Sequence, residues 1–244
     1  MAEPCFVLVH GAWVGGWNWR HVVQRLQARG RAVFAPSLTG LGDRAHLMAP
    51  SVGLSTHIMD VLGVIRTHEL ENVVLVGHSY GGMVISGVAA HAADAVAALV
   101  YLDAFLPQHG QSALDLVSPE RRAQFETSAA ENGDGWRIPP IPASRWGITD
   151  PDQANWLDRH SVDQPLAAMR EPVALNGDEA KVGKRIYARA TGYDPSPFKK
   201  FADKLEDDDA WSVHSVESHH FLNVARPDEI VAILTGAAGL QAAG

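Results

Sequence analysis

The 244-residue chain has a net charge of −8 and 46% apolar residues, a composition typical of a globular protein. A chain of this length can bury one large core, and α/β folds of this size usually form a single domain. The acidic balance and the lack of a long basic run argue against a nucleic-acid-binding surface. No apolar run approaches the ~18–20 residues of a membrane-spanning helix, so we expect no membrane partner.

The single cysteine, Cys5, excludes an internal disulfide. A lone thiol at the start of an apolar strand is typical of a buried side chain, and it fits a reducing compartment. The first four residues lack the charged and apolar regions of a signal peptide. We therefore expect a cytoplasmic protein.

Strands and helices alternate over the first 105 residues. Unbroken apolar runs predict strands that are covered on both faces, and segments with an apolar face at helical spacing lie between them. The expected strands span residues 6–9, 32–35, 73–76 and 96–102, and the expected helices span residues 18–29, 55–69 and 83–91. This order predicts a mostly parallel sheet with helices on both faces, in which catalytic groups gather at the carboxyl ends of the strands.

The alternation stops over residues 106–182 and returns over residues 183–244. The middle segment has helix-like pieces, proline-rich loops and several aromatic residues, so we expect a helical lid over the active edge of the sheet. Its aromatic side chains either line an apolar pocket or form the lid's own small core. The last segment completes a sheet of about six strands in one domain, with strands expected at residues 184–190 and 211–216 and helices at residues 196–205 and 227–235.

A Gly-x-Ser-x-Gly motif at residues 77–81 places a serine at the tip of a sharp turn. An apolar strand precedes the motif and a helical segment follows it, which is the strand–turn–helix order of a nucleophile elbow. Side chains at Gly77 and Gly81 would collide with the neighbouring strand and helix. Because of this context we interpret Ser79 as a nucleophile rather than as a solvated serine in a glycine-rich turn.

A serine hydroxyl near neutral pH needs a base within hydrogen-bond reach. Two candidates, His219 and His220, follow the last expected strand. We favour His220, because its spacing to the closing helix at Pro227 matches similar folds, and His219 then has a loop or packing role. Three further histidines are interpreted as structural: His10, His78 and His214.

The base in turn needs a carboxylate that fixes its tautomer, and in this architecture the acid lies between serine and histidine in the chain. Asp194 follows the strand at residues 184–190 and is our predicted acid. An aspartate before Pro-Ser-Pro also suits a turn or a helix N-cap. Asp103, at the end of the preceding strand, is the alternative acid.

Two backbone amides are predicted to stabilise an oxygen that gains negative charge. One is the N–H of Tyr80 at the start of the helix, and the other is the N–H of Ala12 in the glycine-rich loop after the first strand. We expect the substrate pocket beside them to include Trp13, Phe105 and Trp146. Such a pocket suits a neutral, partly apolar or aromatic small molecule.

Two other motifs carry no predicted ligand. Residues 39–44 contain Gly-x-Gly, but they lack the third glycine and the helix of a dinucleotide site. The aspartates at residues 207–209 are most simply a solvated turn. We therefore expect no metal ion.

The chain resembles the α/β-hydrolase superfamily over essentially its whole length. It is similar to the branch of plant methyl esterases and hydroxynitrile lyases and to bacterial small-ester and carbamate-ester hydrolases, through residues 6–13, 15–17, 39–47 and 76–83. The resemblance implies a Ser79–His220–Asp194 triad, an acyl-enzyme intermediate and no cofactor. A methyl ester or a methyl carbamate is then a plausible substrate.

A difference at two positions distinguishes this chain from the hydroxynitrile lyases of that branch. Hydroxynitrile lyases of this group have a lysine directly after the catalytic histidine and a threonine after the histidine of the first loop, where this chain has Phe221 and Gly11. Without that cation, cyanide has no electrostatic partner, so lyase activity is disfavoured. The sequence thus predicts a serine hydrolase of small esters, with a non-catalytic ligand-binding receptor as the alternative.

Overall fold

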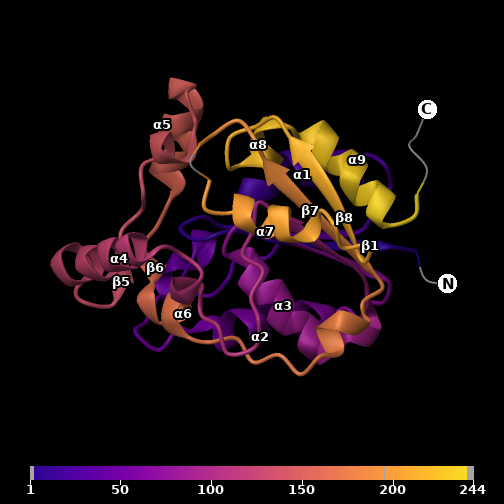
Figure 1. The fold of residues 1–244 in the computed structure, drawn as a ribbon, viewed down its shortest axis with the longest axis horizontal. Coiled ribbons are helices and arrows are strands. Elements are labelled where there is room, and N and C mark those ends of the chain that lie inside the picture. Colours follow the sequence, from indigo (N-terminus) through magenta and orange to yellow (C-terminus); the bar gives the residue numbers. More distant parts are fainter. Residues whose placement is uncertain (1–2, 195, 241–244) are drawn as a thin grey trace.

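Six parallel strands form the central sheet of the protein (Figure 1). The computed structural model describes residues 3–194 and 196–240. The strands follow the order β2-β1-β3-β4-β7-β8, and each neighbouring pair is parallel. They are β1 (Cys5–Val9), β2 (Val33–Phe34), β3 (Val73–His78), β4 (Val96–Leu102), β7 (Lys184–Ala190) and β8 (Trp211–Val216). The predicted α/β class is confirmed.

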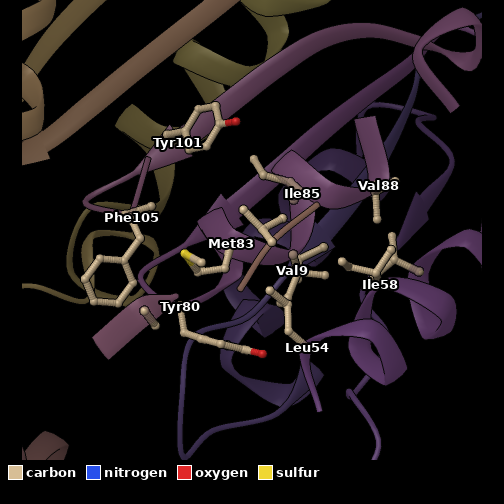
Figure 2. Close-up of a cluster of buried hydrophobic side chains, with 14 of the residues drawn as sticks. Val9, Leu54, Ile58, Tyr80, Met83, Ile85, Val88, Tyr101 and Phe105 are labelled. Atoms are coloured by element: carbon tan, nitrogen blue, oxygen red, sulfur yellow. The ribbon is translucent and has the colours of Figure 1, made fainter. Parts of the chain in front are cut away.

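Helices cover both faces of the sheet (Figure 1). Successive side chains of a strand point to opposite sides, so each strand contributes apolar residues to the layers on both faces. In β3, Leu75 belongs to the apolar cluster under α2 (Leu54–Thr67) and α3 (Gly81–Ala92), whereas Val76 belongs to the cluster on the other face. Figure 2 shows part of the first cluster, with Tyr80 and Phe105 at one end of it. The other face is covered by α1 (Arg20–Gln27), α8 (Leu222–Ala225) and α9 (Pro227–Ala237).

Between β4 and β7 the chain leaves the sheet, and we call residues 106–182 the inserted segment. The part of it with residues 119–160 projects from one side of the molecule (Figure 1). A two-residue antiparallel pair, β5 (Arg137–Ile138) and β6 (Gln164–Pro165), joins its parts. Its helices are α4 (Pro119–Asn132), α5 (Pro151–His160) and α6 (Leu166–Arg170). After β7, α7 (Lys199–Leu205) packs its apolar side against the cluster under α2 and α3.

Several predicted elements are shorter in the structure than in the sequence pattern, as β2 is at Val33–Phe34 against the expected residues 32–35. The helix expected at residues 196–205 begins at Lys199, because the Ser196 hydroxyl accepts the N–H of Phe198 and forms a turn there. The helix expected at residues 18–29 opens with a 3₁₀ turn over Gly16–Trp19 and is α-helical over Arg20–Gln27. Among the described residues, none of the helices has both the length and the apolar character that crossing a bilayer requires.

Gly77 lies in the core at a position that has no room for a side chain. A Cβ atom there would lie 2.6 Å from the Gly81 carbonyl oxygen, so Gly77→Ala is expected to lower the free energy of unfolding by about 1–3 kcal/mol. Gly63→Ala is the matched control, since nothing lies within 4 Å of a Cβ added at that position in α2. The control should be neutral or stabilising by about 0.5–1 kcal/mol. Urea denaturation measures both, and equal midpoints for Gly77→Ala and wild type would contradict the account.

Candidate active site

Ser79 occupies the sharp turn between β3 and α3. Its φ of 56° is in the left-handed region, which is unfavourable for a residue with a side chain. The turn is held from both sides, because the Ser79 N–H donates to the Leu102 carbonyl at 3.2 Å and the Ser79 carbonyl accepts the Phe105 N–H at 3.1 Å. This geometry is that of a nucleophile elbow, and Ser79 lines a cavity.

Asp103 and His220 form a buried pair at the same edge of the sheet. Asp103 directly follows β4, and His220 lies between β8 and α8. The imidazole Nδ1 is 2.7 Å from the carboxylate Oδ2, so the N–H at Nδ1 donates to Asp103 and Nε2 carries no proton. An imidazole in this tautomer can accept a proton at Nε2.

The neighbouring His219 does not share this arrangement. Its Nε2 lies 2.8 Å from the Gln153 Oε1, and its Nδ1 accepts the Phe221 N–H at 3.1 Å. These contacts fit the loop role expected for His219. Of the histidines interpreted as structural, His10 and His78 are buried and hydrogen-bonded, whereas His214 is exposed on β8.

The structure corrects the predicted pairing of Asp194 with His220. Asp194 is exposed, and the carboxylate that contacts His220 belongs to Asp103. The reason lies in the turn after β4. The Asp103 N–H donates to the Ala188 carbonyl at 2.7 Å and its Oδ1 accepts the Ala190 N–H at 3.2 Å, so β7 holds this carboxylate inside the sheet edge.

The loop after β7 contributes a hydroxyl where the sequence predicted a carboxylate. The Tyr193 hydroxyl donates to Asp103 Oδ2 at 2.7 Å, lies 3.3 Å from His220 Nδ1 and accepts the Ser196 hydroxyl at 3.1 Å. Asp103 Oδ2 therefore receives hydrogen bonds from both Tyr193 and His220. Sequence reasoning missed Tyr193, although it is directly adjacent to the predicted acid.

Aromatic rings enclose the His220 imidazole. The ring stacks on Trp146 and on Phe198, each with a centroid 4.9 Å away. This burial lowers the pKa of His220, which keeps the ring neutral at pH 7. Burial also raises the pKa of Asp103, while the hydrogen bonds from Tyr193 and Ala190 act in the opposite direction and favour its ionised form.

The loop after β1 lies against the nucleophile. A Cβ added at Gly11 would be 2.9 Å from the Ser79 Cβ, so only a residue without a side chain fits there. His10 fixes the loop: its Nε2 accepts the Leu38 N–H at 3.0 Å, and its Nδ1 donates to the Gly11 carbonyl at 2.8 Å. Burial lowers the pKa of His10 to about 4, so it stays neutral. Because the peptide is planar, the Ala12 N–H points away from that carbonyl.

The inserted segment holds the other side of this loop. The Trp13 indole N–H donates to the Ile138 carbonyl at 3.0 Å, and the Trp13 carbonyl accepts the Val162 N–H at 2.8 Å. Within the described part of the chain, the N–H groups of Ala12 and Tyr80 have no hydrogen-bond partner. Both residues line the same cavity as Ser79.

A cavity of about 440 Å³ opens beside Ser79. All three predicted pocket residues line it, namely Trp13, Phe105 and Trp146. The inserted segment also contributes Phe125 and Met169, so part of its apolar surface faces the cavity. Other aromatic rings pack among themselves, as in the edge-to-face contact of Trp156 with Trp17 at 4.9 Å. The described residues contain no group of His, Cys, Asp and Glu side chains arranged to bind a metal ion.

Residues 6–233 match the alpha/beta hydrolase family. The chain belongs to that family. It is 44% identical over 233 residues to a carbendazim hydrolyzing esterase of Nocardioides sp. (strain SG-4G), a match that covers 92% of this chain and 96% of the relative. Together with the buried and interacting triad residues, this relative identifies the chain as an esterase.

Other members of the family are more distant. A pyrethroid hydrolase of Sphingobium wenxiniae is 39% identical over 121 residues, which cover 49% of this chain and 42% of the relative. Among solved structures, an extracellular alpha/beta-hydrolase from a Paenibacillus species superimposes with a TM-score of 0.83 at 22% identity. That match covers 97% of this chain and 99% of the other, and it supports the alpha/beta hydrolase fold.

The choice between the two aspartates can be measured directly. Asp103→Asn is expected to lower kcat on a p-nitrophenyl ester by about 10³–10⁴, because the amide favours the wrong imidazole tautomer. Asp194→Asn, at an exposed position, should change kcat by less than about twofold. The reverse pattern would restore Asp194 as the acid.

Tyr193→Phe removes one donor to the carboxylate and keeps the ring. The Tyr193 hydrogen bond lowers the pKa of Asp103, so its loss should raise that pKa. Since the ionised carboxylate is the active form, the acid limb of the kcat/KM profile should move to higher pH by roughly one unit. Ser196→Ala removes the donor to the Tyr193 hydroxyl and the acceptor of the Phe198 N–H but keeps the bond from Tyr193 to Asp103, so it should move the acid limb less. An unchanged acid limb in Tyr193→Phe would contradict this role.

Proposed function

We propose that the protein hydrolyses small, partly apolar carboxylic or carbamate esters through an acyl-enzyme on Ser79. One observation carries the proposal: the 2.7 Å hydrogen bond from His220 Nδ1 to Asp103, at the sheet edge where Ser79 occupies its elbow. This bond leaves Nε2 as the basic nitrogen. The cavity beside Ser79 is enclosed mainly by apolar side chains, as such a substrate requires.

The reaction proceeds in two stages. His220 Nε2 takes the proton of the Ser79 hydroxyl as the oxygen attacks the acyl carbon, and it then gives that proton to the departing alcohol. In the second stage a water molecule loses a proton to His220 and attacks the acyl-enzyme, which releases the acid and restores Ser79. Asp103 stays ionised throughout and stabilises the imidazolium that forms in each stage.

The N–H groups of Ala12 and Tyr80 are the proposed donors to the oxyanion. Three features support them: both residues line the cavity, the two amides lack protein partners within the described residues, and the Gly11 carbonyl is turned away by His10. Each such donor contributes about 10²–10³ to kcat in comparable sites. We further propose that the inserted segment serves as a lid, since Trp146 covers the His220 ring.

The substrate class follows from the cavity and the relatives together. The names of the relatives give carbendazim and pyrethroids as compounds that those proteins hydrolyse. For this chain we propose a methyl ester or a methyl carbamate on an aromatic or similarly apolar group. A single cysteine, Cys5, that is buried in β1 supports a reducing location, and we propose the cytoplasm.

Labelling by a fluorophosphonate tests the proposal against a non-catalytic receptor on the same fold. The wild-type protein should lose its p-nitrophenyl esterase activity as one probe attaches to Ser79, which peptide mass spectrometry identifies. Ser79→Ala should give neither label nor activity, and His220→Ala should be labelled far more slowly because it lacks the base. A folded wild-type protein without label at Ser79 would end the hydrolase proposal.

A further inference from the structure

Three cationic side chains line the cavity beside Ser79. Arg121 comes from α4, Arg145 from the 3₁₀ turn at Ala143–Trp146, and Lys200 from α7. Among the described residues that line the cavity, none has a carboxylate. The concentration of positive charge is notable because the whole chain has 28 acidic and 20 basic residues. No motif in the sequence indicates this cluster, since the three residues lie far apart in the chain.

The two arginines differ from their neighbours in lacking a counter-charge. Arg122, one residue further along α4, pairs with Asp115 at 3.1 Å, and Arg170 pairs with Glu126 at 3.3 Å. Within residues 3–194 and 196–240, neither Arg121 nor Arg145 has a carboxylate within 4 Å. Partial burial and the nearby Arg145 both lower the pKa of Arg121. Within the described residues, no neighbouring carboxylate offsets the positive charge of this guanidinium.

Lys200 is also available to a ligand. Its Nζ donates to the Leu116 carbonyl at 2.6 Å, which joins α7 to the inserted segment. An ammonium group has three donors, so two remain. Among the described residues, no carboxylate pairs with Lys200.

Aromatic rings separate the arginines from the proposed oxyanion donors. Trp13, directly after Ala12, lies 5.8 Å from Phe125 and 6.0 Å from Trp146 between ring centroids. The Arg121 guanidinium is 5.9 Å from the Phe125 ring, and Arg145 directly precedes Trp146. A ligand that places its ester at Ser79 and a flat group along these rings would bring its far end to the cations.

We propose that this cavity is built for esters with a second, anionic group, a carboxylate, which an aromatic ring or a spacer of similar length separates from the cleaved ester. Guanidinium groups bind carboxylates through paired hydrogen bonds, and an unpaired guanidinium beside a cavity is ready to do so. The inference rests on the proposed function, because it assigns the substrate of the same site. It differs from the neutral substrate that the sequence predicts.

A matched pair of substrates isolates the contribution of the charge. Monomethyl terephthalate carries the carboxylate opposite its methyl ester, and methyl 4-carbamoylbenzoate replaces that carboxylate by a neutral amide of similar shape. The measured quantity is the ratio of kcat/KM for the anionic ester to that for the neutral ester. Where turnover is slow, the ratio of the inhibition constants of the two esters against p-nitrophenyl acetate gives the contribution of the charge to binding alone.

Three variants then test the residues. Arg121→Gln and Arg145→Gln should each lower the ratio about tenfold, as expected for one charged hydrogen-bond partner, and the double variant should lower it further. Because each variant is measured with both esters, an effect of the substitution on the cavity as a whole cancels in the ratio, and only the contribution of the charge remains. Arg122→Gln is the control, because this neighbour is paired outside the cavity. Added salt should lower the wild-type ratio more than that of the double variant, which keeps only Lys200.

An equal ratio in wild type and the double variant would overturn the anionic subsite. The subsite would also fail if the variants changed only inhibition by the acid product, because the cations would then serve product release. In both cases fluorophosphonate labelling of Ser79 and cleavage of the neutral ester would leave the hydrolase proposal standing. A wild-type protein that is not labelled would end both.

Discussion

The hydrogen bond between Asp103 and His220 is the interaction on which the rest of the site depends. It joins the ends of β4 and β8, which are not neighbours in the sheet, across the end of β7. Removing either partner would leave the other buried without its charge or hydrogen-bond partner. The bond also selects the imidazole tautomer and leaves Nε2 free to act as the base in the proposed mechanism.

The surroundings of that bond explain why the pair remains functional in an apolar site. Burial alone would favour a protonated Asp103, but the hydroxyl of Tyr193 and the amide of Ala190 donate to its two oxygens. Trp146 and Phe198 exclude water from the faces of the imidazole, which strengthens the electrostatic interactions between the remaining groups. The loop after β7 thus contributes Tyr193 and the inserted segment contributes Trp146 to a site whose Asp103 and Ser79 follow strands of the sheet.

The sequence predicts most of the fold and two of the three triad residues, Ser79 and His220, whereas Asp103 is only the alternative acid. Periodicity and β-branched runs locate the six strands, and the glycines around Ser79 locate the elbow, because these signals are local. The choice between Asp103 and Asp194 is not local: both follow strands, and only the packing of β4 against β7 shows which carboxylate points inward. The role of Tyr193 and the cluster of Arg121, Arg145 and Lys200 arise only when distant segments of the chain come together. No spacing in the sequence therefore reveals them.

The hydrogen-bonded proton on His220 Nδ1 offers the most direct test of the central pairing. Its proton NMR resonance should appear at low field in the wild-type protein, titrate with the triad, and persist in Asp194→Asn. In Asp103→Asn it should disappear or move far upfield, because the amide reverses or weakens the bond. A low-field resonance that survives in Asp103→Asn and is lost in Asp194→Asn would contradict the account.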